Sequence, residues 1–218
     1  MASLIDHTLL KPDATREEIV QLCNDARMYR FAAVCVNGAW TSLAAELLHE
    51  SGVGVATVVG FPLGAVSTRV KVYESLLAID AGATELDMVI HVGALKSGLL
   101  AAVYKDIRSV VEAAAGRALV KVILETGSLT EEEKITASII SDLAGADFVK
   151  TSTGFGQGGA TAEDVALMEA YTGSRVRVKA SGGVRTAAAA AAMIAAGASR
   201  LGTSSGVQIV RGGEGQGY

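Results

Sequence analysis

The feature that most constrains the fold is a regular succession of short apolar segments, each followed by a helical pattern. The segment centres lie near residues 6, 34, 57, 88, 122, 150, 179 and 202, so successive steps are 23 to 34 residues. Strands that are apolar on consecutive residues need cover on both faces, which is typical of parallel sheets with crossover helices. Eight such units predict a (β/α)8 TIM barrel, with an open doubly wound sheet as the alternative.

The helix boundaries carry local signals that support this division. Capping boxes mark two helix starts, because Thr15 is followed three residues on by Glu18, and Thr130 by Glu133. We expect residues 1–210 to form a single barrel domain, a length that α/β barrels commonly use as one domain. The glycine-rich residues 211–218 are expected to be a flexible tail.

Composition and charge exclude several classes of protein. Half of the 218 residues are hydrophobic, which is enough for one sizeable core. The net charge of −4 argues against nucleic-acid binding, because no basic face is available to neutralise phosphates. The two cysteines, Cys23 and Cys35, form no CxxC motif and no metal-ligand pattern, so a reducing cytoplasm fits best. The longest apolar run, 187–196, is too short to span a bilayer, and no membrane association is predicted.

An internal repeat suggests which side chains share the barrel interior. The triplet Ala-Gly-Ala occurs before three of the predicted strands, at residues 81–83, 144–146 and 196–198. Each glycine suits the C-terminal cap of the preceding helix. Four residues past each triplet lie Asp87, Lys150 and Gly202. Because alternate strands of such a barrel form common layers, we expect these three residues to point inward at similar depth.

Two lysines lie near the ends of adjacent strands. Burial disfavours the charged form of Lys150, and the ammonium group of Lys179 on the next strand would repel it, so the pKa of at least one lysine should fall. A neutral lysine amine is a nucleophile toward carbonyls. The alternative is structural, with Asp87 as an ion-pair partner that keeps Lys150 charged. Lys121 fits either a third charge at the site or an ion pair with Glu125.

Glycine-rich loops follow the last two predicted strands. In barrels the loops at these positions commonly bind phosphate through backbone N–H groups. Arg185 could add positive charge, and tight turns without a ligand are the alternative interpretation. The candidate phosphate-binding residues are Gly154, Gly182, Gly183, Gly202, Ser204 and Ser205.

With these features in place, the sequence resembles the deoxyribose-phosphate aldolase family, which are class I Schiff-base aldolases. The most specific matching segments are 148–155 and 179–186, and the match covers nearly the whole chain. Further matches lie at residues 5–12, 59–64, 85–90 and 121–126. The family often has alanine at the position of Ser181, a change that we expect to be tolerated.

The resemblance implies a (β/α)8 barrel that needs no metal or cofactor. It also implies reversible cleavage of 2-deoxy-D-ribose 5-phosphate to D-glyceraldehyde 3-phosphate and acetaldehyde. Lys150 would form the Schiff base, Lys179 would tune it, and Asp87 would serve proton transfer. Gly182, Gly183, Ser204 and Ser205 would hold the substrate phosphate. A homo-oligomer, either dimer or tetramer, is also expected.

The sequence leaves alternatives for the roles of two accessory residues and for the function of the protein. Asp6 is a candidate for binding substrate hydroxyls, or it caps the following turn. One hypothesis for Tyr218 is that the tail folds over the site and this residue assists proton transfer. The alternative is that Tyr218 belongs to a disordered end. The other functions are a sugar-phosphate isomerase or decarboxylase that uses no covalent intermediate, and a non-catalytic sugar-phosphate binding barrel.

Overall fold

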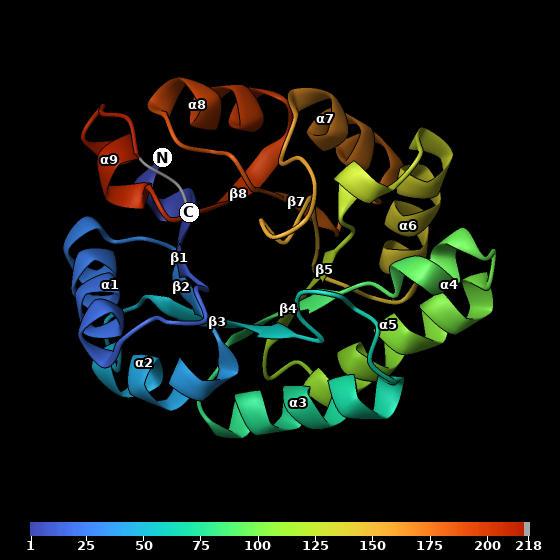
Figure 1. The fold of residues 1–218 in the computed structure, drawn as a ribbon, viewed down its shortest axis with the longest axis horizontal. Helices are drawn as coiled ribbons and strands as arrows, with labels where there is room; N and C mark the ends of the chain where they lie inside the picture. Colours follow the sequence, from blue (N-terminus) through green and yellow to red (C-terminus); the bar gives the residue numbers. More distant parts are fainter. Residues whose placement is uncertain (216–218) are drawn as a thin grey trace.

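Eight parallel strands close into a barrel in the computed structural model, which describes residues 1–215 (Figure 1). The strands are β1 Ile5–Leu9, β2 Ala33–Val36, β3 Gly54–Val59, β4 Glu85–Val89, β5 Leu119–Ile123, β6 Phe148–Lys150, β7 Arg177–Ser181 and β8 Ala198–Thr203. Each strand pairs with its neighbours in sequence, and β1 also pairs with β8, with Asp6 opposite Gly202. This closing pair confirms the predicted barrel and shows that the open-sheet alternative is wrong.

Helices surround the barrel and cover its outer face (Figure 1). The α-helices are α1 Arg16–Tyr29, α2 Thr41–Leu47, α3 Thr68–Asp80, α4 Val92–Lys96, α5 Leu100–Ala114, α6 Glu131–Leu143, α7 Ala162–Tyr171, α8 Ala187–Ala195 and α9 Gly206–Val210. Short 3₁₀ turns are η1 Ala2–Leu4, η2 Gly38–Trp40 and η3 Thr126–Ser128. The sequence pattern does not predict α4 and α9, because five residues are too few to show a helical period. Within residues 1–215, no helix is both long enough and apolar enough to cross a membrane.

The predicted helix signals are confirmed. Both capping boxes form, since the hydroxyls of Thr15 and Thr130 accept from the third helical N–H and the two glutamates accept in return. The glycines of the Ala-Gly-Ala triplets have φ values of 98°, 89° and 112°, which favour glycine. At Gly82 a Cβ atom would also lie 2.6 Å from the Cβ of Ala45.

Apolar packing is concentrated between the barrel and its helices. The main core cluster joins outward-facing strand residues, such as Val149, to buried helix residues, such as Val110. A much smaller apolar cluster contains Leu10, Cys35 and other residues of the first three strand units. The barrel interior instead holds charged side chains, because Asp6, Asp87, Lys121 and Lys179 have no exposed surface. Charges buried in this way need partners, so their arrangement determines what the interior does.

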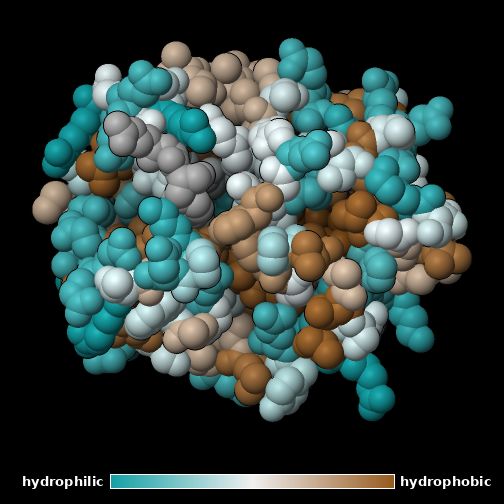
Figure 2. Space-filling model, in the orientation of Figure 1, coloured by the Kyte–Doolittle hydropathy of each residue, from teal (hydrophilic) through white to brown (hydrophobic). Residues whose placement is uncertain are grey.

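One exposed apolar patch lies on α3 and on the loop before it. Its largest members are Leu63, Tyr73 and Leu77, which are 76%, 65% and 52% exposed. Apolar side chains gather in the lower right part of Figure 2, the face that carries α3. None of the residues of this patch lines the pocket at the barrel mouth, so the patch is separate from the site described next.

Candidate active site

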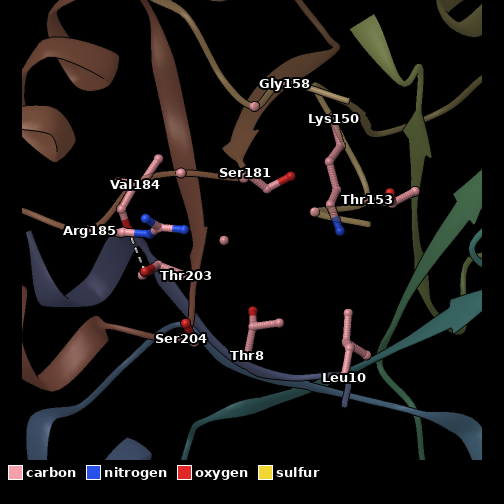
Figure 3. A pocket seen from close by; sticks show the side chains of 15 residues that line it. Thr8, Leu10, Lys150, Thr153, Gly158, Ser181, Val184, Arg185, Thr203 and Ser204 are labelled. Atoms are coloured by element: carbon pink, nitrogen blue, oxygen red, sulfur yellow. Dashed lines mark hydrogen bonds between the residues drawn. The ribbon is translucent and has the colours of Figure 1, made fainter. Parts of the chain in front are cut away.

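A pocket with a volume of about 210 Å³ opens at the end of the barrel where the strands finish (Figure 3). It is lined from the end of β1, from the loops after β6 and β7, and from the end of β8. The lining residues are Thr8, Leu10, Lys150, Thr153, Gly154, Gly158, Gly159, Ser181, Gly182, Gly183, Val184, Arg185, Gly202, Thr203 and Ser204. Figure 3 shows the amine of Lys150 pointing into the space that these residues enclose.

Lys150 is the last residue of β6, and its amine meets Asp87 inside the barrel. The two side chains are joined by a hydrogen bond of 2.8 Å from the Lys150 Nζ to the Asp87 Oδ2. In the strand register Asp87 lies opposite Lys121, whereas Lys150 lies opposite Ile123, two residues nearer the mouth. Strands of a barrel with a shear of eight are staggered by about one residue per strand, so this offset over two strands keeps Asp87 and Lys150 in the same layer. The predicted similar depth and the inward meeting of the two groups are therefore confirmed.

Asp87 is the centre of a fully buried cluster of charges. Its carboxylate accepts hydrogen bonds from Lys121 at 2.6 Å, and from Lys150 and Lys179 at 2.8 Å each. Burial alone would raise the pKa of Asp87, but the nearby lysine charges outweigh burial and hold the pKa well below its usual range. The three lysines therefore favour the ionised form of Asp87 in the resting site.

Lys179 lies behind the pocket and is held in its charged form. Its Nζ contacts the carboxylates of Asp6 and Asp87. Burial would lower the pKa of Lys179, but these two carboxylates outweigh it and raise the pKa above its ordinary value. For Asp6, burial opposes ionisation, yet Lys179, Lys121 and Arg200 lower its pKa to about 2.

The other predicted accessory groups also belong to this cluster. Lys121 pairs with Glu85 at 2.5 Å and with Asp87 at 2.6 Å, so the alternative of an ion pair with Glu125 is wrong. Asp6 has no exposed surface and does not line the pocket. Its carboxylate is instead a partner of the buried cations.

The charges of the cluster do not balance when all its lysines are protonated. The cations are Lys121, Lys150, Lys179 and Arg200. The anions are Asp6, Glu85 and Asp87. Four positive charges therefore face three negative charges. Lys150 is the only one of these seven groups that lines the pocket.

The loops after β7 and β8 form the other side of the pocket. Gly182 and Gly183 have φ values of 87° and 78°, a conformation that side chains rarely adopt. At Gly202 a Cβ atom would lie 2.9 Å from the Ser181 Cβ and 3.0 Å from the Lys179 Cε, so the absence of a side chain leaves room for both residues. Of the six candidate phosphate residues, all except Ser205 line the pocket. The N–H of Ser205 donates to the hydroxyl of Thr203 instead.

Several lining residues could not be selected from the sequence. Thr8 and Leu10 come from the end of β1, and Thr153 comes from the loop after β6. No glycine pattern or repeat marks these residues, and only the closure of β1 onto β8 brings Thr8 and Leu10 to the pocket. Within residues 1–215, no three His, Cys, Asp or Glu side chains gather as a metal site would require.

The end of the described chain lies beside the loop after β7. Glu214 pairs with Thr186 in an antiparallel bridge, and the N–H of Gly215 donates to the carbonyl oxygen of Arg185, a residue that lines the pocket. Tyr218 lies outside the described residues, so its predicted part in proton transfer stays a prediction.

The closed barrel and the pocket at its mouth place the protein in the (β/α)8 class, with a lysine at the end of the barrel where such proteins carry their active sites. The sequence matches the DeoC/LacD family aldolase over residues 1–212. The deoxyribose-phosphate aldolases of Geobacillus sp. and Halalkalibacterium halodurans are 59% and 58% identical to it, over 97% of this chain and 95% of each relative. A deoxyribose-phosphate aldolase from Aeropyrum pernix, solved as a tetramer, is 37% identical with a TM-score of 0.89, over 96% of this chain and 89% of that chain. The chain therefore belongs to the DeoC/LacD family of aldolases, and it is a lyase.

Proposed function

We propose that the protein is a class I aldolase that reversibly cleaves 2-deoxy-D-ribose 5-phosphate to D-glyceraldehyde 3-phosphate and acetaldehyde. The observation that carries the proposal is the position of the Lys150 amine in the charge cluster. Lys150 alone reaches the pocket, and without its charge three cations face three carboxylates. A neutral amine at this position balances the cluster and is a nucleophile toward carbonyls. The names of the similar aldolases support the choice of substrate.

In the synthetic direction the Lys150 Nζ attacks the carbonyl carbon of acetaldehyde, and loss of water gives a protonated imine. The positive nitrogen withdraws electrons, so a methyl proton leaves and an enamine forms. The enamine carbon then attacks the aldehyde carbon of glyceraldehyde 3-phosphate, whose oxygen takes up a proton. Hydrolysis of the resulting imine releases 2-deoxyribose 5-phosphate and restores the amine. Cleavage follows the same steps in reverse.

Asp87 and Lys179 act on the lysine nitrogen. The Asp87 carboxylate accepts a hydrogen bond from that nitrogen, so it stabilises the positive charge of the protonated imine. We assign it the relay of protons, through a water molecule, during the carbinolamine and carbon–carbon steps. Lys179 bonds to the same Asp87 oxygen, and its charge disfavours a second cation at Lys150 before the substrate arrives.

The glycine-rich side of the pocket suits the phosphoryl end of the substrate. We assign phosphate binding to the backbone of Gly182 and Gly183 and to Ser204, with Gly154 facing them from the loop after β6. Arg185 also lines this region and adds positive charge. Binding energy from a group remote from the reacting carbon orients that carbon and lowers the barrier of the chemical step.

Reduction with borohydride in the presence of acetaldehyde tests the proposal. We expect a stable ethyl adduct on Lys150, found by peptide mass spectrometry, and the same yield with EDTA present because the chemistry uses no metal. The variant Lys150→Met is the control and should give no adduct. An isomerase, a decarboxylase or a binding barrel predicts no adduct in the unmodified protein. Either that result or an adduct on another lysine would reject the assignment.

A further inference from the structure

A buried carboxylate, Glu125, lies outside the lysine cluster and has no role in the reaction above. Glu125 is 8% exposed, and none of the ion pairs among residues 1–215 includes it. A buried anion without a cation partner must be stabilised by hydrogen bonds. The partners of this carboxylate therefore indicate what it does.

The backbone turns sharply at Glu125, just past the end of β5. Its φ and ψ are 60° and 59°, a left-handed conformation that is uncommon for a residue with a side chain. On either side, the N–H of Leu124 donates to the carbonyl of Lys150, and the N–H of Thr126 donates to the carbonyl of Thr151. Glu125 is thus an extra residue in the ladder between β5 and β6, as in a β-bulge. Bulges of this kind redirect a side chain, and here the side chain turns to the segment that follows Lys150.

The carboxylate fixes the start of the loop between β6 and α7. The hydroxyl of Thr153 donates to the Glu125 Oε2 at 2.5 Å and accepts from the N–H of Phe155 at 3.0 Å. At Gly156 a Cβ atom would lie 2.8 Å from the Glu125 Cδ, so the loop crosses directly over the carboxylate. The ring of Phe155 also packs edge-to-face against the ring of Phe61, with 5.4 Å between the ring centroids.

The far end of the same loop is fixed to the phosphate side of the pocket. The N–H of Ala160 donates to the carbonyl of Gly182 at 2.9 Å, and a Cβ atom at Gly159 would lie 2.5 Å from that carbonyl oxygen. Between these two attachments the loop curls toward the barrel axis (Figure 1). There it contributes Thr153, Gly154, Gly158 and Gly159 to the pocket lining.

We propose that Glu125 is a positioning residue that sets this loop against the phosphate side of the pocket and so determines affinity for phosphorylated substrates. The proposal rests on the proposed function, because it takes the phosphoryl group to lie beside Gly182. Glu125 makes no side-chain hydrogen bond with Lys150, Asp87 or Lys179 within residues 1–215. Its loss should therefore affect binding of the phosphoryl end more than the reaction at Lys150.

The variant Glu125→Ala tests this role through a comparison of two substrates. We expect the KM for 2-deoxyribose 5-phosphate to rise about tenfold, the effect of losing one hydrogen bond to a charged group. For 2-deoxyribose, which has no phosphate, kcat/KM should change less than about twofold, since ordinary substitutions away from a contact have small effects.

Thr153→Val removes the hydroxyl that donates to the Glu125 carboxylate. It should therefore give the same rise in KM for the phosphorylated substrate and the same small change for 2-deoxyribose. The double variant should be no worse than the poorer single variant, because both remove the same contact. Glu125→Gln keeps an acceptor and should restore most of the affinity.

A matched control separates positioning from general loss of stability. Glu133→Ala removes a carboxylate that accepts from Thr130 in the capping box of α6, and it touches no pocket residue. It should lower thermal stability while leaving the ratio of the two substrates unchanged. If Glu125→Ala lowers kcat/KM equally for 2-deoxyribose 5-phosphate and 2-deoxyribose, so that the ratio of the two values is unchanged, the proposal is overturned.

Two further measurements test the role of Glu125 independently of the proposed Schiff-base mechanism. Borohydride trapping of acetaldehyde in Glu125→Ala should match the unmodified protein, because the reaction at Lys150 is retained. Titration calorimetry with inorganic phosphate should show about tenfold weaker binding in the variant, without any turnover. Absence of an adduct in the unmodified protein would reject the Schiff base alone, whereas unchanged phosphate affinity would reject the role of Glu125.

Discussion

Two lysines of this molecule, Lys71 and Lys150, are almost equally buried but have opposite surroundings. Lys71 lies between α3 and α5, where its Nζ donates to Asp106 at 2.5 Å and to the carbonyl of Val89 at 2.8 Å. The second oxygen of Asp106 accepts from Thr68, so one cation faces one fully bonded anion. Lys150 shares Asp87 with two other lysines and faces an open pocket.

The difference separates burial from reactivity. Both side chains are almost fully buried, yet the charge of Lys71 is matched by its own carboxylate. Around Lys150, by contrast, four cations share three carboxylates, so one positive charge has no matching negative charge. Of the two lysines, only Lys150 lines a pocket that a ligand can enter. A buried lysine becomes a candidate nucleophile when cations outnumber carboxylates around it and one face stays open. Three substitutions test this contrast.

The largest expected effect is on activity in Lys150→Met. Removing the covalent nucleophile should lower kcat for cleavage of 2-deoxyribose 5-phosphate at least about 10⁴-fold, as losses of nucleophiles do in other enzymes. Because the substitution removes the unbalanced cation, the midpoint of thermal unfolding should not fall. A variant that keeps more than a hundredth of the activity, or that is strongly destabilised, would contradict the contrast.

The opposite pattern is expected for Lys71→Met. This change leaves the Asp106 carboxylate buried without its cation, so the free energy of unfolding should fall by about 3–5 kcal/mol. Measured per folded molecule, kcat/KM should stay within about twofold, since the pair does not touch the pocket. Chemical denaturation with urea measures the loss. The double variant Lys71→Met with Asp106→Leu is the control and should recover most of the stability, because it removes both charges.

A smaller effect is expected for Lys179→Leu, which removes one cation from the interior cluster. Three cations then face three carboxylates, and the repulsion that Lys179 exerts on the charge of Lys150 beside the shared Asp87 oxygen is removed. The profile of rate against pH, and that of borohydride trapping, should both move to the alkaline side. Circular dichroism checks that the variant is folded. Profiles that coincide with those of the unmodified protein would show that Lys179 does not tune the nucleophile.

The barrel could be predicted from the sequence because its signals are local. Strand spacing, capping residues such as Thr15 and the repeated glycines each depend on a few neighbouring positions. The approach of Lys150 and Asp87 was also predictable, because a common layer of the barrel places both inward. The offset of two residues between them in the strand register agrees with that layer, because the strands of a closed barrel are staggered.

The cluster beneath the pocket could be predicted only in part. The sequence alone does not show that Lys121 bonds to Glu85 rather than to Glu125, because the choice depends on how far each long side chain reaches across the barrel. Arg200 has no sequence signal, yet its guanidinium bonds to Asp6 at 2.6 Å. The contact between Glu125 and Thr153 likewise follows from a left-handed turn that no local motif marks.

The interior cluster also affects when, during synthesis and folding, the active site can form. Asp6 near the start of the chain bonds to Lys179 and Arg200, which are 173 and 194 positions further on. During synthesis the first strand therefore leaves the ribosome long before its cation partners exist. Contacts between such distant segments form late in folding. A nascent or truncated chain without β8 would hold Asp6 without Arg200 and would lack an intact charge cluster around Lys150. Catalytic competence would then report completion of the chain, and active-site titration during translation could time the closure of the barrel.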